Sequence, residues 1–103
     1  MIAREKVVDY LLNFDHPEGS SKARVLARAG FRAARPEQLE EALRGQHLLG
    51  DARPGSPSPF GEKYEITDYL TGPEGRVLVT SIWMVRYGES FPRLITVVPE
   101  RNE

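Results

Sequence analysis

A short basic stretch, DHPEGSSKAR, holds the side chains in this chain that are best suited to chemistry. His16 stands beside a proline, and Lys22 follows in what the pattern predicts to be the first turn of a helix. Ser20 and Ser21 suit the start of that helix as caps, and Arg24 adds a second cation. Free N–H groups and a partial positive charge at a helix start favour an anion. The stretch therefore predicts a phosphate site beside an imidazole that can move a proton.

The same residues have a purely structural interpretation. The stretch is then a loop, a cap and a solvated helix face, and His16 bonds a backbone group locally. A lysine in the first turn of a helix opposes the helix dipole, and such local conflicts often mark functional positions. Both interpretations stay open at the level of the sequence, and the positions of His16 and Lys22 in space are expected to distinguish them.

A second polar group is expected on strands in the C-terminal half of the chain. Lys63 and Tyr64 stand at the start of the first predicted strand, and Arg93 and Thr96 stand on the last. Alternate residues of a regular strand share a face, so Arg93 and Thr96 should face opposite sides unless a bulge intervenes. Arg93 also fits an ordinary surface residue. Trp83, on the middle strand, is expected in the core.

Together these groups suffice for a ribonuclease that uses no metal. One group takes the proton from a 2′-hydroxyl, cations stabilise the charge at phosphorus, and a further group protonates the leaving oxygen. Three basic residues are assigned to catalysis: His16, Lys22 and Arg93. The residues assigned to phosphate or RNA binding are Ser20, Ser21, Arg24, Lys63 and Tyr64.

Other chemistries are not indicated by the sequence. The chain has no cysteine, which excludes disulfides and thiolate sites. The two histidines, His16 and His47, have no carboxylate at ligand spacing, so we expect no metal, and no cofactor motif is present. Ser81 is an ordinary strand residue unless a base lies nearby.

The composition of the 103 residues is that of a globular domain, with 40% hydrophobic and 28% charged residues. The net charge of −1 provides no global field that would attract nucleic acid. No apolar run approaches the roughly 20 residues that span a bilayer, and the first residues do not resemble a signal peptide. We therefore expect a cytoplasmic protein without a membrane segment.

Hydrophobic periodicity predicts a helical part at about 3–49 and a sheet part at about 62–99, joined by a loop at 50–61. Gly30 is placed to end the second helix in a left-handed cap, and Pro36 to open the third. Short turns between the alternating segments favour antiparallel pairing. The prediction is one α+β domain over all 103 residues, with two to three helices on one face of a three- to four-stranded antiparallel meander.

A longer stretch, DYLLNFDHPEGSSKARVLARAGF, resembles the signature of a family of short bacterial domains, roughly Tyr-x-Leu-Asn-x-x-His-Pro-x-Gly-x-x-Lys-Ala followed by Gly-Phe. The matching residues are Tyr10, Leu12, Asn13, His16, Pro17, Gly19, Lys22, Ala23, Gly30 and Phe31. The order of helices and strands is also similar to that of the barnase, EndoU, colicin and RelE-like toxin ribonucleases. This second resemblance implies RNA cleavage without a metal, and a small antitoxin or immunity protein as partner.

Two functions from different classes follow from these patterns. The first is a metal-independent ribonuclease-like toxin domain of a bacterial toxin–antitoxin or polymorphic toxin system, with RNA as its ligand. The second is a non-catalytic protein-binding module, one member of a two-gene pair, that uses an open sheet face or strand edge. The ribonuclease hypothesis predicts that His16 and Lys22 meet Lys63 or Arg93 on one concave surface.

Overall fold

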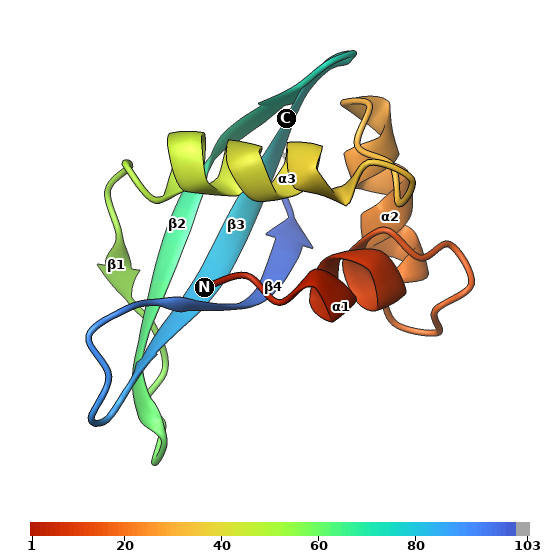
Figure 1. Cartoon of the computed structure of the whole chain (residues 1–103). Coiled ribbons are helices and arrows are strands. Elements are labelled where there is room, and N and C mark those ends of the chain that lie inside the picture. Colours follow the sequence, from red (N-terminus) through yellow and green to blue (C-terminus); the bar gives the residue numbers. More distant parts are fainter. Residues whose placement is uncertain (101–103) are drawn as a thin grey trace.

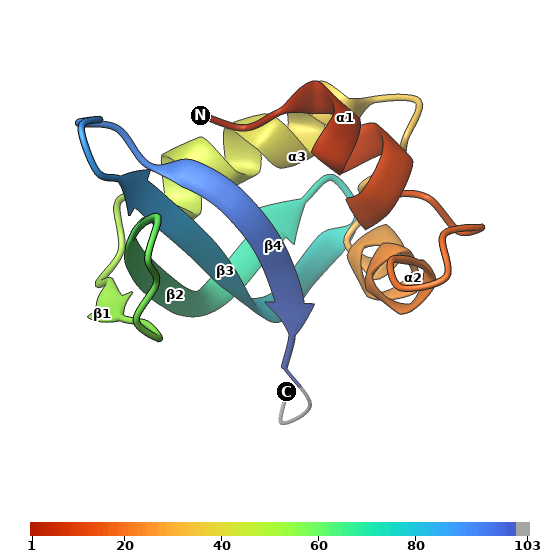
Figure 2. The same cartoon turned by 90° about the horizontal axis from the view of Figure 1, so that it is seen from below.

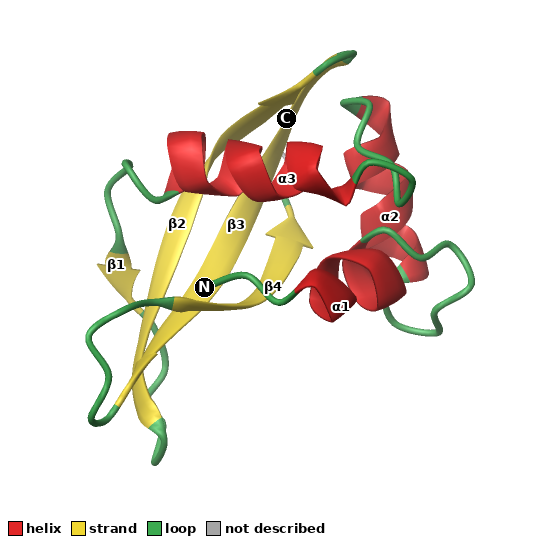
Figure 3. Cartoon of the chain, in the orientation of Figure 1, coloured by secondary structure: helices red, strands yellow, loops and turns green. Residues whose placement is uncertain are grey.

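The computed structural model describes residues 1–100, which form helices followed by a four-stranded antiparallel sheet (Figures 1 and 3). The helical elements are α1 (Arg4–Lys6), η1 (Val7–Leu11), α2 (Ser20–Arg28), α3 (Pro36–Ala42) and η2 (Leu43–His47). The strands are β1 (Arg53–Pro54), β2 (Gly61–Gly72), β3 (Gly75–Arg86) and β4 (Arg93–Pro99). The predicted α+β class is confirmed, and the helices cover one face of the sheet.

Two of the α-helices continue into a π-helical turn before they end. α1 continues into η1, where the Leu12 N–H donates to the Val7 carbonyl at 2.9 Å. α3 continues into η2, where the Leu48 N–H donates to the Leu43 carbonyl at 3.0 Å. These bonds span five residues, which is the pattern of a π-helical turn.

The sheet has the strand order β1-β2-β3-β4, so each strand lies beside its neighbour in sequence. β2 and β3 form a long hairpin in which Gly72 lies opposite Gly75. β1 lies inside the segment 50–61, which the sequence predicts to be a loop. Its two residues form a strand through pairing with Glu65 and Tyr64 of β2. The prediction of three to four strands thus holds with four, and only the shortest strand was missed.

A bulge in β4 changes the faces that its residues take. Ile82 pairs with Thr96, but the next residue, Trp83, pairs with Leu94, which leaves an extra residue between them. Arg93 in turn pairs with Met84. Because paired residues share a face and alternate residues of β3 do so too, Arg93 and Thr96 both lie on the side away from the helices. We refer to this side as the outer face of the sheet.

The core lies between the inner face of the sheet and the helices (Figure 2). α2 contacts β3 and β4, whereas α3 and η2 contact β2. Trp83 is 1% exposed, which confirms its predicted place in the core. The largest of the other fully buried side chains are Phe31, Leu11, Leu26, Leu39, Leu43, Leu70 and His47.

Gly30 ends α2 as predicted, with a φ of +95°. A side chain at this position would also meet Pro73 and Glu74 in the β2–β3 turn. The Glu74 N–H donates to the Ala29 carbonyl at 2.9 Å, so the end of α2 is tied directly to that turn. Across residues 1–100, every helix is too short or too polar to cross a membrane.

Candidate functional site

His16 holds the turn that precedes α2, and no serine side chain caps this helix. The Glu18 and Gly19 N–H groups donate to His16 Nδ1 at 3.0 and 2.9 Å. Gly19 is the cap residue, and the helix start makes no side-chain capping bond of the usual kind. The expectation that Ser20 or Ser21 caps this helix is therefore wrong, because both serines already lie inside α2 and the cap position falls on Gly19.

These two hydrogen bonds also determine the tautomer of the His16 ring. Since Nδ1 accepts two N–H bonds, a neutral ring carries its proton on Nε2. The half-buried ring then offers Nε2–H as a donor, while its basic nitrogen is occupied. His16 is thus arranged to donate a hydrogen bond and is poorly arranged to remove a proton.

The His16 and Lys22 side chains meet at the ring of Tyr10. The ring centroids of His16 and Tyr10 are 4.9 Å apart at an interplanar angle of 72°. Lys22 Nζ lies 5.9 Å from the Tyr10 ring centroid. On the other side, the Tyr10 hydroxyl lies 3.4 Å from Thr96 Oγ1 on the bulged strand. We call these four residues, Tyr10, His16, Lys22 and Thr96, the Tyr10 cluster.

Glycine at position 19 allows the Tyr10 cluster to close. A Cβ on Gly19 would lie 2.1 Å from the Tyr10 carbonyl oxygen and 3.0 Å from its ring. The backbone before α2 therefore runs directly against η1, and no larger residue fits without moving one of them. Close backbone contact is what brings the imidazole over the tyrosine ring.

Lysines line the free edge of β4. Lys22 Nζ donates to the Val97 carbonyl at 2.8 Å, and Lys6 Nζ donates to the Ile95 carbonyl at 2.7 Å. These bonds satisfy edge carbonyls that would otherwise be open to another strand. They also place two ammonium groups about 7 Å apart along the strand, because each residue rises by about 3.3 Å. The edge beside the Tyr10 cluster is consequently positive.

The other predicted residues of the first stretch lie toward solvent on α2. Ser21 and Arg24 are exposed, and Ser20 is half-buried. Residues two apart on a helix face different ways, so Arg24 points away from Lys22. Their predicted role in RNA binding stays a prediction.

Lys63 and Tyr64 lie on opposite faces of β2. Lys63 pairs with Met84 on the outer face, and Tyr64 pairs with Trp83 on the inner face. The Tyr64 hydroxyl donates to Glu62 Oε2 at 2.7 Å, and this bond raises the pKa of the tyrosine. Tyr64 therefore remains protonated and engaged, whereas the Lys63 ammonium lies beside a hollow on the outer face.

Arg93 is held by a carboxylate. Its Nε and Nη2 donate to the two carboxylate oxygens of Glu89 at 2.8 and 2.7 Å. This paired bond lowers the pKa of Glu89 and raises that of Arg93. The guanidinium also lies 5.0 Å from the ring centroid of Phe91. Its charge is thus largely compensated where it stands.

The structure joins the two predicted groups only in part. Lys63, Met84 and Arg93 form one row across the outer face, and Thr96 belongs to the next paired row, about 7 Å along β3. Thr96 contacts the Tyr10 hydroxyl, and the Tyr10 ring contacts His16 and Lys22. His16 and Lys22 are therefore linked through Tyr10 to Thr96 on the outer face, whereas Lys63 and Arg93 do not enter the Tyr10 cluster.

A family model described as a domain of unknown function, DUF6883, matches residues 1–101, nearly the whole chain. The chain belongs to this family. Comparison with curated proteins and with solved structures found no match. The stretch DYLLNFDHPEGSSKARVLARAGF lies inside this DUF6883 domain, and in the structure its residues build most of the Tyr10 cluster.

The DUF6883 domain also contains a buried serine–histidine pair. Ser81 Oγ lies 2.7 Å from His47 Nδ1, so a base does lie beside this serine. His47 Nε2 donates to the Asp68 carbonyl at 3.1 Å, and the Trp83 indole N–H donates to Ser81 Oγ at 2.8 Å. Because a carbonyl can only accept, the Ser81 hydroxyl must donate to Nδ1. Both residues are 0% exposed, so the pair serves the core and cannot reach a substrate.

Tyr10 is the cluster residue that sequence reasoning did not assign to the site, and its place in the resembling stretch was its only signal. Thr96 was considered with Arg93 on the last strand but was not assigned to the site, and the bulge places these two residues on the same face. Within residues 1–100, His, Asp and Glu side chains nowhere gather in a group of three that could hold a metal.

Proposed function

We propose that this DUF6883 domain binds RNA at the Tyr10 cluster and cleaves it without a metal cofactor. The observation that carries the proposal is the convergence of donors in one half-buried spot. An imidazole, an ammonium and two hydroxyls come there from the loop before α2, from α2, from η1 and from β4. No carboxylate takes part in these contacts, so the group that best satisfies them is an anion such as a phosphate.

The residues have distinct roles in this proposal. Lys22 stabilises the negative charge that develops on the phosphorus oxygens, and His16 Nε2–H donates to the same group. The Tyr10 and Thr96 hydroxyls can each accept a proton and give one. In the first step the 2′-oxygen bonds to phosphorus and the bond to the 5′-oxygen breaks. The proton leaves the 2′-oxygen and reaches the 5′-oxygen through the hydroxyls, so no further reactant is needed.

The proposal revises the role first assigned to His16. Its basic nitrogen is engaged by two backbone N–H groups, so it acts as a donor to phosphate and not as the general base. Arg93 is compensated by Glu89 and is assigned no catalytic role. A small antitoxin or immunity protein as partner stays a prediction from the resemblance.

The proposal is tested with purified protein and a labelled single-stranded oligoribonucleotide in the presence of EDTA. The wild type should yield fragments that end in a 2′,3′-cyclic phosphate. Tyr10→Phe keeps the ring under His16 and Lys22 and removes only the hydroxyl. Lys22→Met keeps an unbranched side chain and removes the charge. Each should lower the cleavage rate by about 100-fold or more, as expected for the loss of a proton-transfer or charge-stabilising group.

Arg76→Met is the matched control, since it removes an exposed cation that lies over the Tyr69 ring at the far end of the β2–β3 hairpin. It should leave the rate unchanged. In cells, induced wild type should slow growth and degrade RNA, and Tyr10→Phe should do neither. Failure of the wild type to cleave any RNA would leave the non-catalytic binding module as the better hypothesis. Cleavage that persists in both cluster variants would refute the roles of Tyr10 and Lys22.

A further inference from the structure

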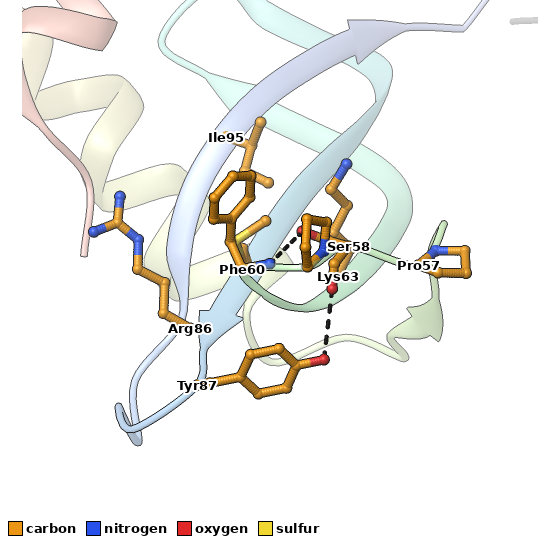
Figure 4. A pocket seen from close by; sticks show the side chains of 9 residues that line it. Pro57, Ser58, Phe60, Lys63, Arg86, Tyr87 and Ile95 are labelled. Atoms are coloured by element: carbon orange, nitrogen blue, oxygen red, sulfur yellow. Dashed lines mark hydrogen bonds between the residues drawn. The ribbon is translucent and has the colours of Figure 1, made fainter.

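A hollow lies on the outer face, where the segment before β2 passes beside β3 and β4 (Figure 4). Its volume is about 800 Å³. Figure 4 shows Phe60 beside Ile95, with Arg86 to one side and Lys63 to the other. The remaining lining residues are Pro57, Ser58, Pro59, Met84 and Tyr87.

Two aromatic rings at this hollow are unusually exposed. Phe60 is 70% exposed and Tyr87 is 66% exposed. Neither residue is loosely attached, because the Tyr87 N–H donates to the Phe60 carbonyl at 3.1 Å and the Phe60 N–H donates to Ser58 Oγ at 3.1 Å. Two prolines stiffen the same segment. Two exposed rings on an anchored backbone forgo the stabilisation that burial would give, which is characteristic of a binding surface.

The charges at the hollow are of one sign. Lys63 and Arg86 line it, and none of its lining residues is acidic. Of the neighbouring carboxylates, Glu62 accepts from the Tyr64 hydroxyl and Glu89 from Arg93, while Glu65 lies beyond Lys63 on the same face and does not line the hollow. The chain as a whole carries −1, so this pairing of rings and cations is local. It suits a ligand that is both planar and anionic.

The hollow and the Tyr10 cluster both include residues of β4. Ile95 lines the hollow, and the next residue, Thr96, contacts the Tyr10 hydroxyl. Lys6 lies between them, with its ammonium on the Ile95 carbonyl. A single-stranded nucleic acid that is bound at the Tyr10 cluster and runs across β4 would pass Lys6 first and then the rings of Phe60 and Tyr87 on the outer face.

We propose that this hollow is a base-binding subsite for single-stranded RNA, in which a nucleobase stacks on Phe60 or Tyr87 and its phosphate contacts Lys63 or Arg86. The inference rests on the proposed function, because the reacting phosphate lies at the Tyr10 cluster. Aromatic stacking combined with cations is the usual arrangement for binding single strands, and it tolerates sequence. A duplex keeps its bases stacked inside and cannot offer them to these rings.

The test uses an all-deoxy single-stranded oligonucleotide of mixed sequence as the probe, because it lacks the 2′-hydroxyl and cannot be cleaved. Its dissociation constant is measured by fluorescence anisotropy. Phe60→Ala and Tyr87→Ala should each weaken binding by roughly 5- to 150-fold, the range for loss of one stacked base. Lys63→Met should weaken binding and lower the slope of log K against log salt by about one. A duplex of the same sequence should bind more weakly.

Tyr69→Ala is the control, since Tyr69 is also exposed on the outer face but lies opposite Leu78 near the other end of the hairpin. It should bind like the wild type. Wild-type binding by Phe60→Ala and Tyr87→Ala would overturn the subsite, as would an equal loss in Tyr69→Ala. If the two ring variants lose binding to an acidic peptide while oligonucleotide binding stays intact, the hollow takes a protein ligand and the subsite is overturned.

The two proposals fail in different ways. If the oligonucleotide binds through Phe60 and Tyr87 but no RNA is cleaved, the subsite stands and the ribonuclease function falls. If RNA is cleaved in a Lys22-dependent manner while Phe60→Ala and Tyr87→Ala keep the KM of the wild type, the function stands and the subsite falls.

Discussion

Replacement of Ser81 by alanine should be among the most destabilising single-atom changes in this protein. The Ser81 hydroxyl accepts from the Trp83 indole at 2.8 Å and donates to His47 Nδ1 at 2.7 Å. Ser81→Ala leaves both partners buried without this bond, since Ser81 and His47 are 0% exposed and Trp83 is 1% exposed. An unsatisfied buried polar group costs about 1–3 kcal/mol, so loss of both bonds should lower the free energy of unfolding by roughly 2–6 kcal/mol.

Urea unfolding at pH 7.5 measures this loss, with fluorescence of Trp83, the one tryptophan of the chain, as the probe. For a slope of about 1.5 kcal/mol per molar urea, a loss of about 3 kcal/mol moves the midpoint down by about 2 M. Thr67→Val is the matched control, because it removes a hydroxyl bonded to Thr80 at 2.7 Å on the outer face, where water can replace it. It should cost less than about 1 kcal/mol. Equal losses in the two variants, at an unchanged slope, would refute the account of the buried network.

Two further predictions concern pH and the contact beneath α2. Burial lowers the pKa of His47, so the unfolded chain binds a proton more readily than the folded one, and stability should be complete above about pH 6.5 and fall below it by up to about 1.4 kcal/mol per pH unit. Urea midpoints at pH 7.5, 6.5 and 5.5 measure this, and a wild type that is equally stable at all three contradicts it. Gly19→Ala should lower the Tm by roughly 10 °C, because its Cβ would lie 2.1 Å from the Tyr10 carbonyl oxygen and relief of that clash costs on the order of 2 kcal/mol. Gly45→Ala, with nothing within 4 Å of the new Cβ, should leave the Tm unchanged or raise it, and a similar fall in both variants would mean that the close contact is not the cause.

The local structure of this protein was predictable because it depends on neighbours in sequence. Gly30 and Pro36 mark a helix end and a helix start through their own backbone preferences. The strand segment around Trp83 has apolar residues on both of its faces, which predicts that it lies between two other strands. The missed strand β1 is short and gains its pairing only from β2.

The candidate site was predictable only as a set of residue types. His16 and Lys22 were singled out by residue type and spacing. The sequence alone could not show that the basic nitrogen of His16 accepts hydrogen bonds from two backbone N–H groups. It also could not show that Arg93 is compensated by Glu89, because either residue can face water in an isolated strand or turn.

The sequence by itself determined the order of helices and strands, the face of each that is apolar and the clustering of basic residues around the start of α2. These depend on periodicity and on backbone preferences that act over a few residues. Only the tertiary structure decided that Tyr10 joins His16, Lys22 and Thr96, and that a bulge places Arg93 and Thr96 on the same face. Such contacts join η1, α2 and β4 across most of the chain, and their geometry depends on how the whole core packs.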